Sequence, residues 1–207
     1  MKARFITLEG GEGVGKSTQA TRLAEALRAR GIDVVQTREP GGSPGAEAIR
    51  GLLLDGDADR WTAGAEALLF AAARADHVAK TIRPALARGA WVVCDRFLDS
   101  SRAYQGGADG IDGADLLTLH KVGSGGLLPD RTLLLALPSD EGDRRAKLRD
   151  GEGGDRFGMR TCDYHRQVAT TFLRLANGEP DRFRVIDAHG TPEQVTMRLI
   201  EALADLM

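Results

Sequence analysis

Short apolar segments recur along the chain and alternate with segments of helical periodicity. We predict that the apolar segments are strands: Ala3–Leu8, Ile32–Thr37, Ala90–Cys94, Arg131–Leu137 and Phe183–Ile186. After the first of them, small and apolar residues repeat at the three- and four-residue spacing of a helix face: Ala20, Leu23, Ala24 and Leu27. Strands that alternate with helices in this way predict an α/β fold.

The arrangement of the strands follows from their composition. Because they are short, apolar and separated by helices, we expect a five-stranded, mainly parallel sheet covered by helices on both faces. Gly31 and Gly89 are placed to end the first helix and the long third one. Ligands of such a sheet bind at the carboxyl ends of its strands, so the residues that follow each strand are candidates for chemistry.

The most specific local pattern follows the first predicted strand. It reads Gly10-Gly11-Glu12-Gly13-Val14-Gly15-Lys16-Ser17-Thr18 and matches the phosphate-binding pattern GxxxxGK[ST] of the P-loop. The glycines allow successive backbone amides to turn inward around phosphate oxygens, and the following helix directs its positive end at the same place. Lys16 can reach the β- and γ-phosphates, and the Ser17 hydroxyl can ligate Mg²⁺. We therefore predict a P-loop NTPase fold that binds a nucleotide triphosphate.

Composition limits the other possibilities. A chain of 207 residues with 42% hydrophobic and 28% charged residues suits one globular domain, residues 1–207. The net charge of -2 argues against a protein that coats nucleic acid or an anionic membrane. Cys94 and Cys162 have neither metal-like spacing nor companions. No signal peptide or membrane span is evident, so we expect a soluble cytoplasmic protein.

Charged residues follow the second and third predicted strands. Asp95 ends the run Trp91-Val92-Val93-Cys94, where a Walker-B-like acid holds Mg²⁺ through water, although a plain helix cap would look the same. Arg38 and Arg96 also stand at strand ends. Two arginines beside a phosphate loop would form a second anion site, which suggests a phosphorylated acceptor.

A polar stretch near residues 141–160 has two interpretations, a cationic lid or a solvated loop. Its basic residues are Arg144, Arg145, Lys147, Arg149, Arg156 and Arg160. The charges alone favour the solvated loop.

Three of these segments together resemble the bacterial thymidylate kinases. They are the P-loop with the preceding Leu8-Glu9, the segment Thr37–Gly42, and the segment Asp95–Gly106, which is the most specific of the three. The resemblance extends from about Phe5 to the last helix. It implies a Mg²⁺-dependent cytosolic homodimer that transfers the γ-phosphoryl group of ATP to dTMP, with helices after the second and third strands at the dimer interface.

The resemblance also implies roles around the thymine base and the deoxyribose. Phe70 corresponds to a phenylalanine that stacks on thymine, although it could be a core residue, and Arg74 to an arginine that hydrogen-bonds the base. Tyr104 corresponds to a tyrosine that packs against C2′, where a ribose hydroxyl would not fit. Ser101 and Gln105 correspond to polar positions around the base and sugar.

Around the phosphates, the resemblance assigns Arg38 and Arg96 to the phosphate of dTMP. Glu39 corresponds to an acid near the acceptor sugar and metal. Glu9 corresponds to an acid beside the metal and acceptor, or it organises the loop. The expected catalytic set is Lys16, Arg96, Arg149 and Glu9, with Mg²⁺ held at Ser17 and Asp95.

The lid assignment depends on the P-loop sequence. One type of thymidylate kinase carries an arginine in the P-loop, whereas the other has a glycine-rich loop and basic residues in the lid. Because this P-loop has no arginine, the resemblance implies that the lid, about residues 141–160, supplies the charge, with Arg149 first and Arg145 and Lys147 behind it. Gly158 stands where the family often has glutamate, and the fourth strand ends Leu135-Ala136-Leu137-Pro138 where aspartate-valine is usual.

Alternative functions remain open to different degrees. Another P-loop nucleotide kinase with a different pyrimidine acceptor would share the ATP site, and Phe70, Arg74 and Tyr104 argue against it. A GTPase would need an Asn-Lys-x-Asp motif, but the only asparagine, Asn177, precedes glycine. A DNA-bound ATPase is disfavoured by charge and size, so no nucleic-acid or membrane partner is expected.

Overall fold

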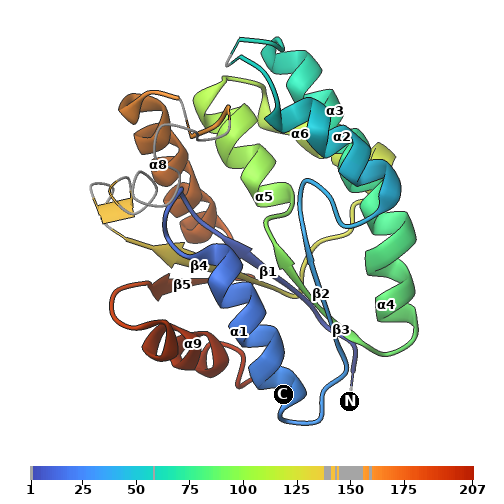
Figure 1. The fold of residues 1–207 in the computed structure, drawn as a ribbon, viewed down its shortest axis with the longest axis vertical. Coiled ribbons are helices and arrows are strands. Elements are labelled where there is room, and N and C mark those ends of the chain that lie inside the picture. The colour runs from blue at the N-terminus through green and yellow to red at the C-terminus, as the bar shows by residue number, and fades with distance from the viewer. Residues whose placement is uncertain (1, 58, 138–140, 143, 145–155, 159) are drawn as a thin grey trace.

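A computed structural model describes residues 2–57, 59–137, 141–142, 144, 156–158 and 160–207. Within these ranges, one parallel sheet contains five strands: β1 (Phe5–Glu9), β2 (Val34–Arg38), β3 (Trp91–Asp95), β4 (Arg131–Ala136) and β5 (Phe183–Asp187). The strand order is β2-β3-β1-β4-β5 (Figure 1). The predicted α/β fold is confirmed, and each strand begins and ends within about two residues of its predicted bounds.

Helices connect the strands and cover both faces of the sheet (Figure 1). The described helices are α1 (Lys16–Arg28), α2 (Pro44–Leu54), α3 (Ala63–His77), α4 (Arg83–Ala87), α5 (Leu98–Ser101), α6 (Gly113–Ser124), α8 (Cys162–Gly178) and α9 (Pro192–Glu201). Two π-helical segments extend them, η1 (Val78–Ile82) between α3 and α4, and η2 (Arg102–Ala108) after α5. Gly31 and Gly89 adopt left-handed φ angles of 80° and 90° just after α1 and α4, where the sequence predicts helix ends.

Alternation along the strands divides the core between the two faces. Ile6 and Leu8 of β1 pack with α1 and α9, whereas Phe5 packs on the opposite face against η1 and α4. A third cluster on that opposite side joins Tyr104 and Phe157 to α8. Within the described residues, we find no helix with the length and apolar character needed to cross a bilayer.

The register of the strands gathers the predicted chemistry at one edge of the sheet. Leu8 of β1 pairs with Asp95 of β3, and Arg38 of β2 pairs with the same Asp95. The P-loop leaves β1 one residue later, after Glu9. The carboxyl ends of three adjacent strands therefore converge, which places the P-loop beside Arg38 and Arg96.

Candidate active site

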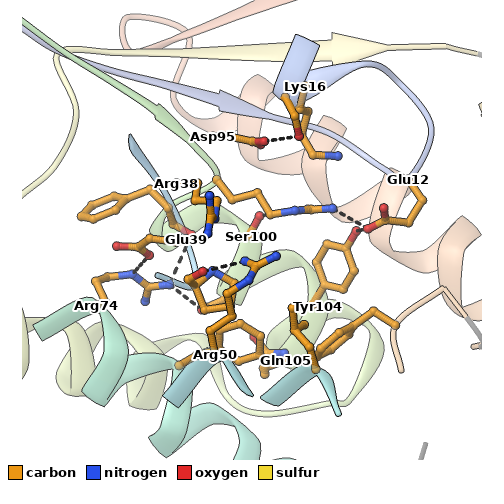
Figure 2. A pocket seen from close by; sticks show the side chains of 18 of the residues that line it. Glu12, Lys16, Arg38, Glu39, Arg50, Arg74, Asp95, Ser100, Tyr104 and Gln105 are labelled. Carbon is orange, nitrogen blue, oxygen red and sulfur yellow. Dashed lines mark hydrogen bonds and ion pairs between the residues drawn. The ribbon is translucent and has the colours of Figure 1, made fainter. Parts of the chain in front are cut away.

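A cavity of about 600 Å³ opens at the carboxyl edge of the sheet (Figure 2). Its walls come from the P-loop, the ends of β2 and β3, and helices α2, α3, α5 and η2. The predicted site residues that line it are Glu12, Gly13, Gly15, Lys16, Ser17, Thr18, Arg38, Glu39, Phe70, Arg74, Asp95, Arg96, Ser101, Tyr104 and Gln105. The fold thus brings the predicted donor and acceptor residues to one cavity. Gly10, Gly11 and Val14 instead face a smaller hollow towards α8, which Glu12 also borders.

The P-loop depends on glycine for its shape. Gly10 has a φ of 143°, and a Cβ there would lie 2.5 Å from the backbone oxygen of Leu135. Gly15 has a φ of 92° and is the N-cap of α1, with no side-chain hydrogen bond to the first turn of the helix. The amides at this helix end are therefore available for phosphate oxygens, as the motif predicts.

Lys16 is buried at the base of the P-loop. Its Nζ donates to the backbone oxygen of Gly11 at 2.5 Å. Burial, followed by the charge of Arg96, lowers the pKa of Lys16 to about 8. The nearby carboxylates of Glu12 and Asp95 act in the opposite direction and favour the charged ammonium. Burial and the neighbouring carboxylates thus have opposite effects on the ammonium group of Lys16, beside the place where phosphates would lie.

Ser17 and Asp95 form a small oxygen site. The Ser17 Oγ donates to Asp95 Oδ2 at 2.5 Å. Asp95 Oδ1 is buried and has no hydrogen-bond partner among the described residues. A hydroxyl beside an unsatisfied carboxylate oxygen fits Mg²⁺, which binds few protein oxygens and takes its other ligands from phosphates and water. The described residues contain no group of three or more His, Cys, Asp or Glu suited to a metal.

Glu12 projects from the P-loop towards the predicted acceptor side. Its carboxylate accepts a hydrogen bond from the Tyr104 hydroxyl at 2.9 Å and forms an ion pair with Arg96 (Figure 2). The sequence motif assigns Glu12 to the ATP loop, and it cannot show this direction of the side chain. The Arg96 guanidinium also lies 5.1 Å from the centroid of the Tyr104 ring. Arg96 is the only described non-glycine residue with a positive φ, 69°, which is a strained conformation typical of functional sites.

Glu9 lies behind this segment rather than on the cavity wall. Its Oε1 accepts from the amides of Phe97 at 2.8 Å and Ser100 at 3.3 Å, and its Oε2 accepts from the Ser100 hydroxyl at 2.6 Å. Burial and the charge of Asp99 raise the pKa of Glu9 to about 8, although these hydrogen bonds lower it. In this conformation, Glu9 organises the turn that carries Arg96.

At the far end of the cavity, Arg74 is held by buried hydrogen bonds. Its Nε donates to Glu39 Oε2 at 2.8 Å, and its Nη2 donates to the Ser101 hydroxyl at 2.9 Å. Glu39 Oε1 lies 3.0 Å from His77 Nδ1, and His77 Nε2 lies 2.7 Å from the Thr37 hydroxyl. His77 could not be predicted from the sequence, because a histidine inside an apolar helix looks like any core residue.

Gln105 and Phe70 complete this end. Gln105 Nε2 donates to Glu66 Oε1 at 2.9 Å, and Arg156 Nη2 donates to Glu66 Oε2 at 3.3 Å. Burial, against the hydrogen bond from Gln105, raises the pKa of Glu66. Phe157 packs edge-on against Phe70, with ring centroids 5.7 Å apart. Phe70 lines the cavity and also packs against the core, and its predicted stacking on a base stays a prediction.

Arg156 corrects one expectation. The sequence groups it with the basic residues of a lid or solvated loop, but it is only 1% exposed. Its Nη1 donates to the Leu53 oxygen at 2.8 Å and its Nε to the Asp57 oxygen at 2.7 Å. A buried ion pair and two backbone acceptors account for a residue that its charge alone would place at the surface.

Two further arginines line the cavity, and the sequence predicts only one of them. Arg38, predicted to hold the acceptor phosphate, is half exposed, and its Nη2 pairs with Glu47 Oε1 at 3.1 Å. Arg50 lines the same cavity and donates from Nη1 to the Pro40 oxygen at 2.7 Å. No motif marks Arg50, because it lies within α2 and not after a strand.

Part of the predicted lid lies outside the described residues. This holds for Arg145, Lys147 and Arg149, and for Pro138 at the end of the fourth strand. Of the remainder, Arg144 and Gly158 are exposed. Arg160 lies 3.7 Å from Glu66 and 3.9 Å from Asp109. The role expected of Arg149 therefore stays a prediction.

The fold and the cavity together define a class of protein. The cavity has a P-loop at one end, a Ser17–Asp95 oxygen site beside it and several arginines opposite. These are the parts of a P-loop kinase with an anionic acceptor. Residues 8–199 match the family model of thymidylate kinase. The chain belongs to the thymidylate kinase family, as its sequence resemblance predicts.

Individual relatives agree with this assignment. A thymidylate kinase of Rhizorhabdus wittichii is 66% identical, with the whole of both chains covered. One from Caulobacter vibrioides is 49% identical over 96% of this chain and 95% of its own. A solved thymidylate kinase structure from Ehrlichia chaffeensis has a TM-score of 0.79 and 31% identity, covering 98% of this chain and all of the other. None of these findings favours a kinase with a different acceptor.

Proposed function

We propose that this protein transfers the γ-phosphoryl group of ATP to dTMP and releases dTDP and ADP. The observation that carries the proposal is the single cavity shared by the P-loop and by the cluster of Phe70, Arg74 and Gln105. A monophosphate whose base lies in this cluster would extend its phosphate towards Arg96 and the P-loop (Figure 2).

On the donor side, the P-loop amides and the ammonium of Lys16 would hold the triphosphate of ATP. For this to happen, Lys16 must exchange its contact with the Gly11 oxygen for phosphate oxygens. We propose that Ser17 and Asp95 hold Mg²⁺, and their geometry and the unsatisfied Asp95 Oδ1 support this. When bound, Mg²⁺ would neutralise phosphate charge.

On the acceptor side, Arg38, Arg50 and Arg96 surround the position proposed for the dTMP phosphate. Phe70 offers a ring face for thymine, and Arg74 offers donors for a carbonyl oxygen of the base. Tyr104 is fixed between Glu12 and Arg96, so its ring would form a rigid wall beside the sugar. A rigid wall of this kind excludes a bulkier sugar better than a mobile side chain does.

The reaction needs charge neutralisation more than a base. The second pKa of a phosphate monoester is about 6, so the dTMP oxygen is an anionic nucleophile near neutral pH. This oxygen forms the new bond to the γ-phosphorus, while the bond from that phosphorus to the bridging oxygen of ADP breaks. Lys16 and Arg96 would offset the charge on the transferring group. The resemblance adds Arg149 to this set.

Two further properties belong to the same proposal and rest on the family. We expect a homodimer and a cytoplasmic location. Sedimentation of the purified protein at two concentrations tests the dimer.

An assay of coupled ADP release tests the proposed function. It uses ATP and Mg²⁺ with dTMP, dUMP, UMP or thymidine in separate reactions. Strong preference for dTMP supports the proposal, and failure with thymidine supports the need for an acceptor phosphate. Equal use of UMP would contradict the thymidylate assignment and leave the ATP site intact.

A further inference from the structure

Three polar side chains form a buried chain beneath the far end of the cavity. Gln105, Glu66 and Arg156 are each only 1% exposed. They come from distant parts of the sequence: Gln105 from η2, Glu66 from α3, and Arg156 from the segment before α8. Of these three residues, only Gln105 lines the cavity. Glu66 and Arg156 lie behind it, in positions to orient Gln105 without touching a ligand.

The contact with Glu66 determines which end of the Gln105 amide is held. An ionised carboxylate can only accept hydrogen bonds, so the amide group that faces it at 2.9 Å must be Nε2 and not Oε1. Gln105 Oε1 has no hydrogen-bond partner among the described residues. Gln105 Oε1 therefore presents a fixed hydrogen-bond acceptor to the cavity.

Glu66 is itself held in place. Arg156 donates to Glu66 Oε2, and its other nitrogens donate to the backbone oxygens of Leu53 and Asp57. Arg160 adds a second cation 3.7 Å from the same Oε2. Both guanidinium groups favour the ionised carboxylate, and the backbone contacts prevent Arg156 from turning with it. The orientation of the Gln105 side-chain amide is thus fixed by these contacts.

We infer that Glu66 is a positioning residue that makes the cavity select pyrimidines with an N–H at the ring nitrogen next to the recognised carbonyl. Thymine and uracil have this imide edge. Cytosine has a bare nitrogen there, which would face Gln105 Oε1 acceptor to acceptor. Arg74 offers only donors and matches the adjoining carbonyl of the imide, but not the amino group of cytosine. This inference rests on the proposed function and specifies its acceptor.

The substitution Glu66→Gln tests this inference. The new side chain has nearly the same shape but can donate as well as accept, so the Gln105 amide can rotate and present Nε2 to the ligand. Titration calorimetry would give the dissociation constants of dTMP and dCMP. We expect the preference for dTMP over dCMP to fall roughly tenfold, a partial loss because Arg74 still opposes cytosine.

Two comparisons distinguish the loss of Gln105 orientation from a general disruption of the cavity. Glu25→Gln makes the same chemical change at an exposed position of α1 and should keep the wild-type preference. In a Gln105→Leu background, Glu66→Gln should leave the preference unchanged, because no amide remains to rotate. An unchanged preference in the single variant, or equal weakening of both ligands, would overturn the inference.

If Glu66→Gln does not fold, the wild-type protein can be used to test whether the Gln105 amide is fixed. The side-chain amide protons of Gln105, assigned by their loss in Gln105→Leu, should be distinct and exchange slowly without ligand. Rapid exchange would contradict a fixed amide. Failure of the wild type to release ADP with dTMP would instead refute the proposed function, and the two failures are therefore distinguishable.

Discussion

The ammonium group of Lys16 illustrates how a residue's burial and its ligand act in opposite directions. Burial lowers the pKa of Lys16 to about 8, whereas a bound triphosphate favours the charged form. Above about pH 8, ATP binding should therefore take up a proton, and affinity should fall by up to about tenfold per pH unit. Calorimetry in buffers of different ionisation enthalpy measures this uptake. Lys16→Arg stays charged and should abolish it, and equal uptake in that variant would assign the proton to another group.

Arg149 is the residue whose proposed role depends most on the resemblance to the family. Because it would act on charge that develops during transfer, Arg149→Ala should lower kcat by about 10³-fold and leave the KM for ATP within about threefold. Arg144→Ala removes an exposed arginine of the same stretch and serves as the control. Loss of ATP binding in proportion to turnover would count against a role in the transition state.

At the scale of elements, the packing of η2 against α8 supports the acceptor end of the cavity. A Cβ on Gly107 would lie 2.1 Å from Thr171 Oγ1 and 2.7 Å from Thr171 Cβ, so only glycine fits. Gly107→Ala should lower the free energy of unfolding by about 1–3 kcal/mol. Thr171→Ala should recover part of this loss, since Cβ remains. Denaturant unfolding measures both changes.

A glycine in open space provides the matched control for that substitution. A Cβ on Gly64 of α3 would meet nothing within 4 Å. Gly64→Ala should therefore raise the stability by up to about 1 kcal/mol, because alanine is the better helix former. Equal effects of the two substitutions would show that propensity, and not contact with Thr171, dominates.

The predictable elements are those that local sequence determines. The strands were predictable because their apolar runs are bounded by helices and turns, and the P-loop because its glycines and Lys16 are contiguous. Arg50 was not, because it lies within α2 and no motif marks it. His77 and Glu66 were not, because their contacts are with Glu39 and Gln105, which are distant in the sequence. Arg156 was misjudged for the same reason: Leu53, Asp57 and Glu66 together make its burial favourable, and no local pattern reveals them.

At the scale of the whole molecule, we propose that one cavity holds donor and acceptor for a single direct transfer. The most direct test uses ATP whose γ-phosphorus is chiral by oxygen isotopes, with dTMP as acceptor, followed by stereochemical analysis of the dTDP formed. One in-line displacement predicts inversion at phosphorus. Retention would require a phosphorylated enzyme intermediate and would contradict direct transfer from ATP to dTMP.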